Sequence, residues 1–280
     1  MGACVARVRA ELHLQSLDYD EFDKGEWIAM FGASSNLRCM QNPNTYYTFE
    51  LLQALTVTGI WIWGFVDGCG MKFFVYLTYW SLTGQLLYVW LDFFTAYMAT
   101  EMSAGKRPVV KRIPLYAQAT WCLFDMLLPT TFLVFVLYFC LVVNWDYPPT
   151  RTLSYVTHGG NFALMMLDVI FSRKPYYLLH GLYFALEAFV YILFTYLYFL
   201  AGGTDCDGMP YIYGVLDWGG KFRLAGTVGG MVFFVVAPVV NIMFWLLVSF
   251  CFPGLRPRPD KSVASLELAR RGHPPLTPLR

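Results

Sequence analysis

Six long apolar stretches alternate with short polar segments along this chain. They are 47–66, 73–97, 115–143, 155–171, 176–201 and 224–251. An α-helix rises about 1.5 Å per residue, so each stretch is long enough, or nearly so, to cross a hydrocarbon core about 30 Å thick. The pattern predicts an all-α fold, a polytopic membrane bundle of six transmembrane helices with a tail at each end.

Basic residues are distributed unevenly between the two sides of this predicted bundle. Six crossings place both tails on one side, together with the connections 98–114 and 172–175. That side carries all but four of the 20 Lys and Arg residues, the exceptions being Lys72, Arg151, Lys221 and Arg223. Because cytosolic segments of membrane proteins are enriched in Lys and Arg, we expect both termini in the cytosol. The membrane is expected to be the plasma membrane or the endoplasmic reticulum.

Composition agrees with a membrane protein and divides the chain into three parts. Hydrophobic residues make up 57% and charged residues 14%, whereas soluble domains carry about 25% charged residues. The parts are a cytosolic tail (1–46), the transmembrane domain (47–251) and a Pro- and Arg-rich cytosolic tail (252–280) with too little apolar content to fold alone. With a net charge of +1 and no basic block, we expect membrane lipids, not nucleic acid, as partners.

The cysteines do not indicate a metal site. No pair has metal-ligand spacing, and the chain lacks a glycine-rich phosphate loop and a helix-borne metal motif, so no metal or cofactor is expected. Only Cys69 and Cys206 fall in connections on the non-cytosolic side. They could form one disulfide in an oxidising compartment, or remain two unrelated loop thiols.

One connection, 202–223, is long enough to form a structured lid. It is rich in glycine and carries Tyr211, Tyr213 and Trp218. Amphipathic rings are favoured at the membrane–water interface. We therefore expect these three side chains to belong to an interfacial belt.

Polar side chains within the predicted spans need partners, because an unsatisfied polar group in hydrocarbon costs several kcal/mol. Asp92 lies near a cytosolic helix end, where water could reach it, and Asp168 could pair with the basic residues at 173–174. Asp125 and Glu187 are nearer mid-helix and are interpreted as packing partners. A transport path through them is the alternative, but the broken helices and charged rows of such paths are not evident.

Thr78 and His158 share a depth in this topology. Both of their helices enter from the non-cytosolic side, with Thr78 about five residues in (roughly 7–8 Å) and His158 about three (roughly 4–5 Å). A hydroxyl with a neighbouring imidazole is the minimal activated nucleophile. The structural alternative is that the Thr78 hydroxyl bonds back to a carbonyl of its own helix and that His158 caps its helix.

Three segments resemble the rolling stone family of membrane proteins, whose founding member is associated with myoblast fusion. They are KFFVYLTYW (Lys72 to Trp80), HGGNFALMMLDVIFSRKP (His158 to Pro175) and AGGTDCDGMPYIYGVLDW (Ala201 to Trp218). The resemblance implies a multi-pass membrane protein that acts in cell fusion or membrane organisation.

That family is in turn distantly similar to the androgen-induced integral-membrane hydrolases, which cleave esters between a fatty acid and a hydroxy fatty acid. Their nucleophilic Thr lies in a Tyr-Leu-Thr context, which is 76–78 here, and their basic His opens the segment that begins at His158. The similarity implies an alternative function, an intramembrane lipid-ester hydrolase with Thr78 as nucleophile and His158 as base. Asn161, one turn after His158, could orient the imidazole or help to hold the oxyanion.

This hypothesis makes a geometric prediction. The Thr78 hydroxyl and a ring nitrogen of His158 should lie within about 3–4 Å of each other. Both should face an apolar cavity wide enough for an acyl chain, lined by side chains such as Phe162, Met165 and Phe184.

Overall fold

The computed structural model describes residues 26–32, 42–110, 112–143 and 152–251. Every regular element in this part of the chain is a helix, as predicted. The predicted tail 252–280, and most of the predicted tail 1–46, lie outside the described residues.

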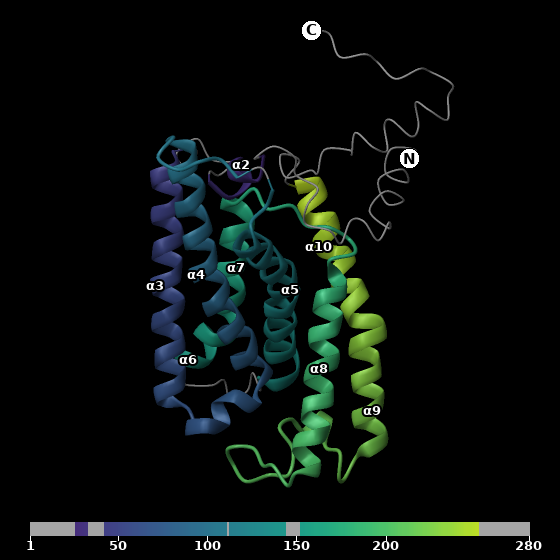
Figure 1. Ribbon diagram of the computed structural model, residues 1–280. Coiled ribbons are helices and arrows are strands. Elements are labelled where there is room, and N and C mark those ends of the chain that lie inside the picture. Colours follow the sequence, from purple (N-terminus) through teal and green to yellow (C-terminus); the bar gives the residue numbers. More distant parts are fainter. Residues whose placement is uncertain (1–25, 33–41, 111, 144–151, 252–280) are drawn as a thin grey trace, which may run out of the picture.

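Long helices run alternately up and down the molecule (Figure 1). Three of the helical segments contain π-helical turns, labelled η6, η7 and η9. The segments are α3 (Pro43–Asp67), α4 (Leu77–Ser103), α5 (Leu115–Leu137) with η6 (Tyr138–Val142), α6 (Thr152–Tyr155) with η7 (Val156–Gly160) and α7 (Asn161–Phe171), α8 (Gly181–Leu200), and α9 (Phe222–Met231) with η9 (Val232–Val236) and α10 (Ala237–Cys251).

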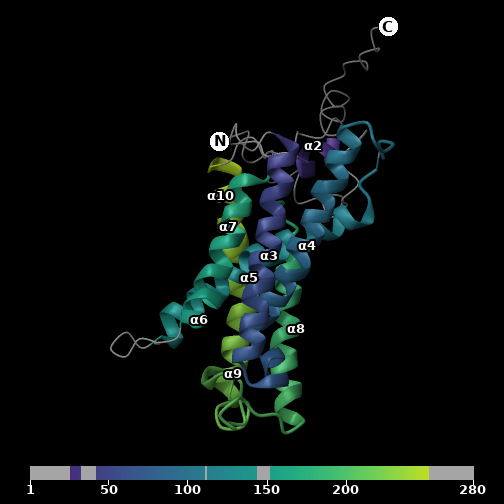
Figure 2. The same cartoon turned by 90° about the vertical axis from the view of Figure 1, so that its left-hand side faces the viewer.

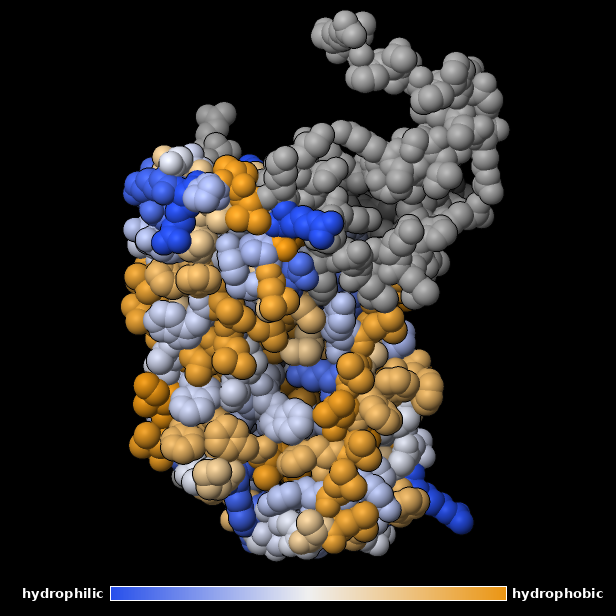
Figure 3. Space-filling view, in the orientation of Figure 1, coloured by the Kyte–Doolittle hydropathy of each residue, from blue (hydrophilic) through white to orange (hydrophobic). Residues whose placement is uncertain are grey.

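Four helices are long and apolar enough to cross a membrane, judged by length and composition: Pro43–Asp67, Leu115–Cys140, Gly181–Leu200 and Phe222–Ser249. Figure 3 shows the corresponding apolar belt, with hydrophilic side chains gathered toward the two ends of the molecule. The predicted spans 73–97 and 155–171 are also helical, but they are less apolar because they bury polar side chains. The structure thus supports a helical membrane protein with four such helices.

Helix α4 lies at the centre of the packing. It contacts α3 along its length, α5 on another side, and the short helix α2 (Glu26–Gly32) near its C-terminal end. Trp27 and Phe31 of α2 are fully buried, and the Trp27 ring nitrogen donates to the Val110 carbonyl at 3.0 Å. Figure 2, a quarter-turn from the first view, shows α6 leaning away from the side of the bundle.

The close packing of α8 against α10 depends on a glycine. A Cβ at Gly181 would overlap the side chain of Asn241. Asn241 donates to the Leu178 carbonyl and accepts from the Tyr176 hydroxyl, both at 2.8 Å. The same asparagine therefore fixes the connection between α7 and α8 against α10.

The lid loop, residues 201–221, connects α8 to α9 and folds back against the start of α4. A disulfide joins Cys206 of this loop to Cys69, with Cα atoms 6.0 Å apart. Cys69 directly precedes the 3₁₀ helix η5 (Gly70–Val75). The covalent link spans 137 residues of sequence and ties the lid loop to the connection between α3 and α4.

Hydrogen bonds reinforce this attachment. The Lys72 ammonium donates to the Thr204 hydroxyl at 2.9 Å and to the Asp205 carbonyl at 2.6 Å. The Cys206 amide donates to the Tyr76 hydroxyl at 3.1 Å. The lid loop is therefore held at several points in addition to the disulfide.

Replacing Cys206 with Ser should destabilise the protein, because closing so long a loop restricts the unfolded chain. The expected loss is about 3–5 kcal/mol, or a fall in Tm of roughly 5–15 °C for a domain of this size. Thermal unfolding in detergent measures the shift. The matched control is Cys140→Ser, since Cys140 is an exposed free thiol, and it should leave Tm unchanged. Equal Tm values for the two variants would contradict a stabilising bridge.

Candidate functional site

Thr78 lies in the first turn of α4. The predicted span began at 73, but residues 70–75 form the 3₁₀ helix η5, and Tyr76 is extended (φ −90°, ψ 137°) before α4 begins at Leu77. The predicted start of this helix at residue 73 was therefore wrong. The first four N–H groups of a helix have no partner within it and carry the positive end of the helix dipole. Thr78 is thus placed where a developing negative charge is stabilised.

The structure brings Thr78 and His158 together. The Thr78 Oγ1 atom lies 3.1 Å from the His158 Nε2 atom. The His158 Nδ1 atom lies 2.6 Å from the carbonyl oxygen of Ser154. Because a carbonyl oxygen can only accept, Nδ1 carries the ring proton. Nε2 is then left with a lone pair that can accept the Thr78 hydroxyl proton.

A ring stack and a local distortion of the helix set the orientation of His158. The residue belongs to the π-helical segment η7, and such single π turns occur frequently at functional sites. Its imidazole lies parallel to the Tyr138 ring, with centroids 3.5 Å apart and an interplanar angle of 9°. Tyr138 itself begins the π-helical segment η6. Two irregular helix turns therefore meet at the imidazole.

Tyr213 of the lid loop also reaches this site. The Leu77 amide donates to its hydroxyl at 3.2 Å, and the phenol interacts with the hydroxyls of Thr78 and Tyr191. Burial raises the pKa of Tyr213 to about 12, so the phenol stays protonated at physiological pH. The sequence predicted only that Tyr213 belongs to an interfacial belt. No sequence pattern shows which side chain of a loop folds back onto a helix.

Asn161 does not orient the imidazole, because both ring nitrogens of His158 have other partners. Its amide nitrogen donates to the Ser81 hydroxyl at 3.0 Å, and that hydroxyl donates to the Thr78 carbonyl at 2.9 Å. Asn161 thus supports the first turn of α4 from α7. The orienting group is the Ser154 carbonyl, a backbone atom that no residue pattern identifies.

The expected lining of an acyl cavity is packed as core. Met165 and Phe184 are both 1% exposed, and Phe162 contacts the Phe132 ring at 5.3 Å between centroids. An apolar groove of about 440 Å³ lies elsewhere, on the outside of α8 and α9. His158 is half-buried, and Thr78 is buried with 7% of its surface exposed.

Comparison with known proteins identifies the family. Residues 30–252 match the family model described as Protein rolling stone. The chain belongs to the rolling stone family. It is 27% identical over 215 residues to Protein rolling stone of Drosophila melanogaster, covering 72% of this chain and 74% of that relative. No solved structure matches the chain significantly.

In this rolling stone protein, a buried polar seam continues from Thr78 along α4. Its members recur at intervals of three and four residues, so they form one stripe; they are Thr78, Ser81, Gln85, Tyr88 and Asp92. The Gln85 amide donates to the Asn161 carbonyl at 3.2 Å. The seam therefore faces α7 and leads from the Thr78 end of α4 toward a second polar cluster.

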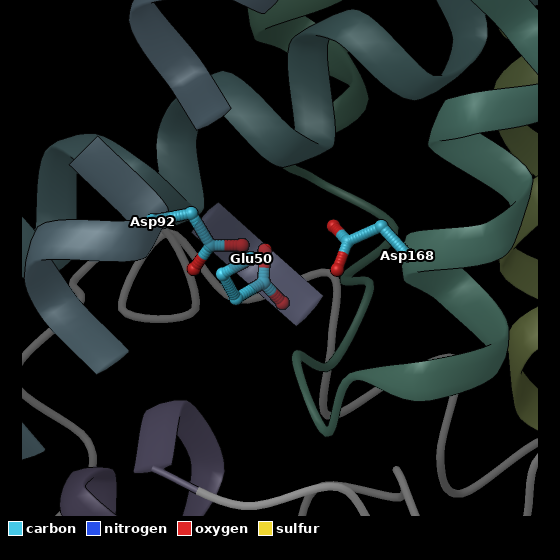
Figure 4. A group of neighbouring side chains, drawn as sticks. All are labelled: Glu50, Asp92 and Asp168. Atoms are coloured by element: carbon cyan, nitrogen blue, oxygen red, sulfur yellow. The ribbon is translucent and has the colours of Figure 1, made fainter. Parts of the chain in front are cut away.

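That second cluster contains three buried carboxylates, Glu50, Asp92 and Asp168, from α3, α4 and α7 (Figure 4). One oxygen of each lies within 4.8 Å of the others. The Lys174 ammonium lies 2.5 Å from Asp92 Oδ2 and 3.1 Å from Asp168 Oδ1. It also donates to the Tyr88 hydroxyl at 2.9 Å. Lys174 thus supplies a positive charge to two of these three carboxylates, Asp92 and Asp168.

The prediction that Asp168 pairs with a neighbouring basic residue is confirmed by the contact with Lys174. The expectation of a hydrated Asp92 was wrong, since its side chain is 0% exposed. The reason is that the connection after α7 turns inward and inserts Lys174 between the helices.

Asp125 and Glu187 have partners on neighbouring elements, as the packing interpretation predicted. Asp125 pairs with His180, and Glu187 accepts from the Thr130 hydroxyl on α5. These contacts explain the two carboxyl groups without a transport path.

Replacing Lys174 with Met should destabilise the fold strongly, because it leaves Asp92 and Asp168 buried without their cation. Breaking a buried pair costs about 3–5 kcal/mol. The matched control is Lys106→Met. Lys106 is 66% exposed and pairs with Glu101 at 3.0 Å, so its loss should cost less than about 1 kcal/mol.

Thermal unfolding in detergent compares the two variants. Adding Asp168→Asn to Lys174→Met should recover part of the lost stability, because one uncompensated charge is removed. Equal losses for the two lysine variants would contradict the structural role of Lys174.

Proposed function

We propose that this rolling stone family protein is an intramembrane hydrolase of lipid esters, with Thr78 as nucleophile and His158 as general base. The observation that carries the proposal is the 3.1 Å contact between Thr78 Oγ1 and His158 Nε2, with Nδ1 bonded to a carbonyl oxygen. A hydroxyl, a correctly protonated imidazole and a group that orients the imidazole are the parts of an activated nucleophile.

The first half of the reaction forms an acyl-enzyme. Thr78 Oγ1 attacks the ester carbonyl carbon while its proton moves to His158 Nε2, and the carbonyl π electrons move onto the carbonyl oxygen. The tetrahedral intermediate collapses and expels the alcohol oxygen, which takes the proton from Nε2. Thr78 is left esterified with the acyl group.

Water completes the cycle. His158 Nε2 takes a proton as water attacks the acyl carbon, and it returns that proton to Thr78 Oγ1 as the fatty acid leaves. In both halves the negative oxygen develops beside the first turn of α4. The positive end of the helix dipole stabilises an anion in such a position.

The surroundings of the pair favour an apolar substrate that approaches from the membrane. His158 is half-buried and lies in η7, which directly follows α6, the helix that leans away from the bundle (Figure 2). A lipid could therefore present its ester laterally, with its acyl chains still in the bilayer. Esters between a fatty acid and a hydroxy fatty acid are the substrate class suggested by the hydrolases that the family resembles.

The topology belonging to this proposal has six spans with both termini in the cytosol. α4 has 27 residues, or about 40 Å of helix, and the segment 152–171 lies beside it in the same bundle. Their polar groups face the protein interior, where such groups are tolerated within membranes. The uneven distribution of Lys and Arg favours this orientation, in the plasma membrane or the endoplasmic reticulum. The lid loop and Thr78 then lie on the non-cytosolic side.

Glycosylation mapping tests this topology. A flexible segment carrying an Asn-Gly-Thr acceptor, inserted after the exposed Gly208 in the lid loop, should be glycosylated in cells. The same segment added after Arg280 should remain unmodified. Modification at the C-terminus with none in the lid loop would contradict the orientation.

Ester hydrolysis by the purified protein tests the chemistry. Thr78→Ala should abolish turnover of a long-chain p-nitrophenyl ester in detergent, because no nucleophilic hydroxyl remains. Thr78→Ser should keep measurable turnover, since the hydroxyl is retained. His158→Gln should lower kcat by at least about 100-fold through loss of the base.

Thr83→Ala is the matched control on the same helix, because the Thr83 hydroxyl accepts from Trp61 at 2.9 Å and does not face the imidazole. It should leave turnover unchanged. The competing interpretation is a non-enzymatic protein of cell fusion or membrane organisation. It predicts no turnover above background, or turnover that survives Thr78→Ala.

A further inference from the structure

The lid loop supplies a third functional group beside Thr78 and His158. Tyr213 lies far from both residues in the sequence and on a different element, yet its hydroxyl accepts from the amide of Leu77, the residue before Thr78, at 3.2 Å and interacts with the Thr78 side chain. The residue is half-buried, and its ring also lies against the Tyr76 ring, 6.1 Å between centroids. The pairing of Thr78 with His158 does not require a tyrosine at this position.

The hydrogen bonds around Tyr213 hold its hydroxyl at the start of α4. The phenol oxygen accepts from the Leu77 amide at 3.2 Å. The neighbouring Tyr191 hydroxyl donates to the Val75 carbonyl at 2.9 Å. The Tyr213 oxygen is thus held from the backbone side and lies next to the side chains of Thr78 and Tyr191. Because the pKa of the phenol is raised to about 12, the group acts as a donor throughout the physiological range.

The attachments of the lid loop hold Tyr213 in one position. The disulfide between Cys69 and Cys206 ties the loop to the connection before α4. The Lys72 ammonium donates to the loop residues Thr204 and Asp205. A donor on a free loop would have to be ordered during each reaction cycle, whereas this one is ordered in advance. Pre-organised donors are the ones that stabilise a transition state effectively.

We propose that Tyr213 is a third catalytic residue of this site and that its O–H donates to the carbonyl oxygen of the bound ester. The proposal rests on the hydrolase function proposed above. When Thr78 Oγ1 attacks, the carbonyl π electrons move onto that oxygen, and the Tyr213 O–H binds the resulting oxyanion without transferring its proton. When the intermediate collapses, the electron pair re-forms the C=O bond and the hydrogen bond weakens.

Tyr213→Phe tests this role, because it removes one hydroxyl and keeps the ring. In the purified full-length protein, hydrolysis of a long-chain p-nitrophenyl ester should show kcat lowered about 100-fold with KM little changed, as for other single oxyanion donors. Labelling of Thr78 by an alkyl fluorophosphonate should slow to a similar extent, because the phosphonyl oxygen uses the same donor.

The matched control is Tyr211→Phe, which removes a hydroxyl from the same lid loop, and it should leave kcat and the labelling rate unchanged. Tm and the Cys69–Cys206 linkage should be the same in both variants, which separates a catalytic role from a structural one. Wild-type-like kcat for Tyr213→Phe, or a kcat lowered only together with a lost disulfide or a fallen Tm, would overturn the role of Tyr213 and leave the Thr78–His158 pair standing. Absence of Thr78-dependent turnover in the wild-type protein would overturn both.

Discussion

The need to pair polar groups inside an apolar bundle determines most of this structure. Hydrocarbon offers no hydrogen-bond partner, so a polar side chain in a membrane helix must find one within the protein. α4 carries buried polar side chains in a stripe from Thr78 to Asp92, and η7 and α7 carry partners for them from His158 to Asp168. Burying this seam fixes how the two helices face each other. The apolar helices around them provide the surface toward the membrane.

The two ends of the seam differ in a way that suggests different roles. At one end, Lys174 pairs with Asp92 and Asp168 in a fully buried cluster, and an arrangement of that kind fixes helix positions. At the other end, the buried Thr78 and the half-buried His158 form an uncharged pair beside a helix N-terminus. Such a pair can exchange a proton without moving a charge into the membrane. The chemistry proposed for the rolling stone family protein therefore belongs at the second end.

The sequence allowed the all-helical fold and the closeness of Thr78 and His158 to be predicted, because helical rise converts residue counts into positions along neighbouring helices. It could not show that α4 begins at Leu77, since residues 73–77 are almost continuously apolar and hide the break at Tyr76. The inward turn of Lys174 and the return of Tyr213 depend on connections whose paths carry no periodic signal. The two less apolar helical segments, α4 and 152–171, carry the polar seam. These polar side chains lower the mean hydropathy of both segments, so composition alone argues against a membrane span there.

The central claim is that the Thr78 hydroxyl is an activated nucleophile. Its most direct test is peptide mass spectrometry of the native protein after treatment with an alkyl fluorophosphonate in membranes. The account predicts one covalent adduct on the peptide that contains Thr78, located at that residue by fragmentation, and no adduct when the protein is unfolded before treatment. An adduct confined to another residue, or none under conditions that label a known serine hydrolase in the same sample, would contradict it.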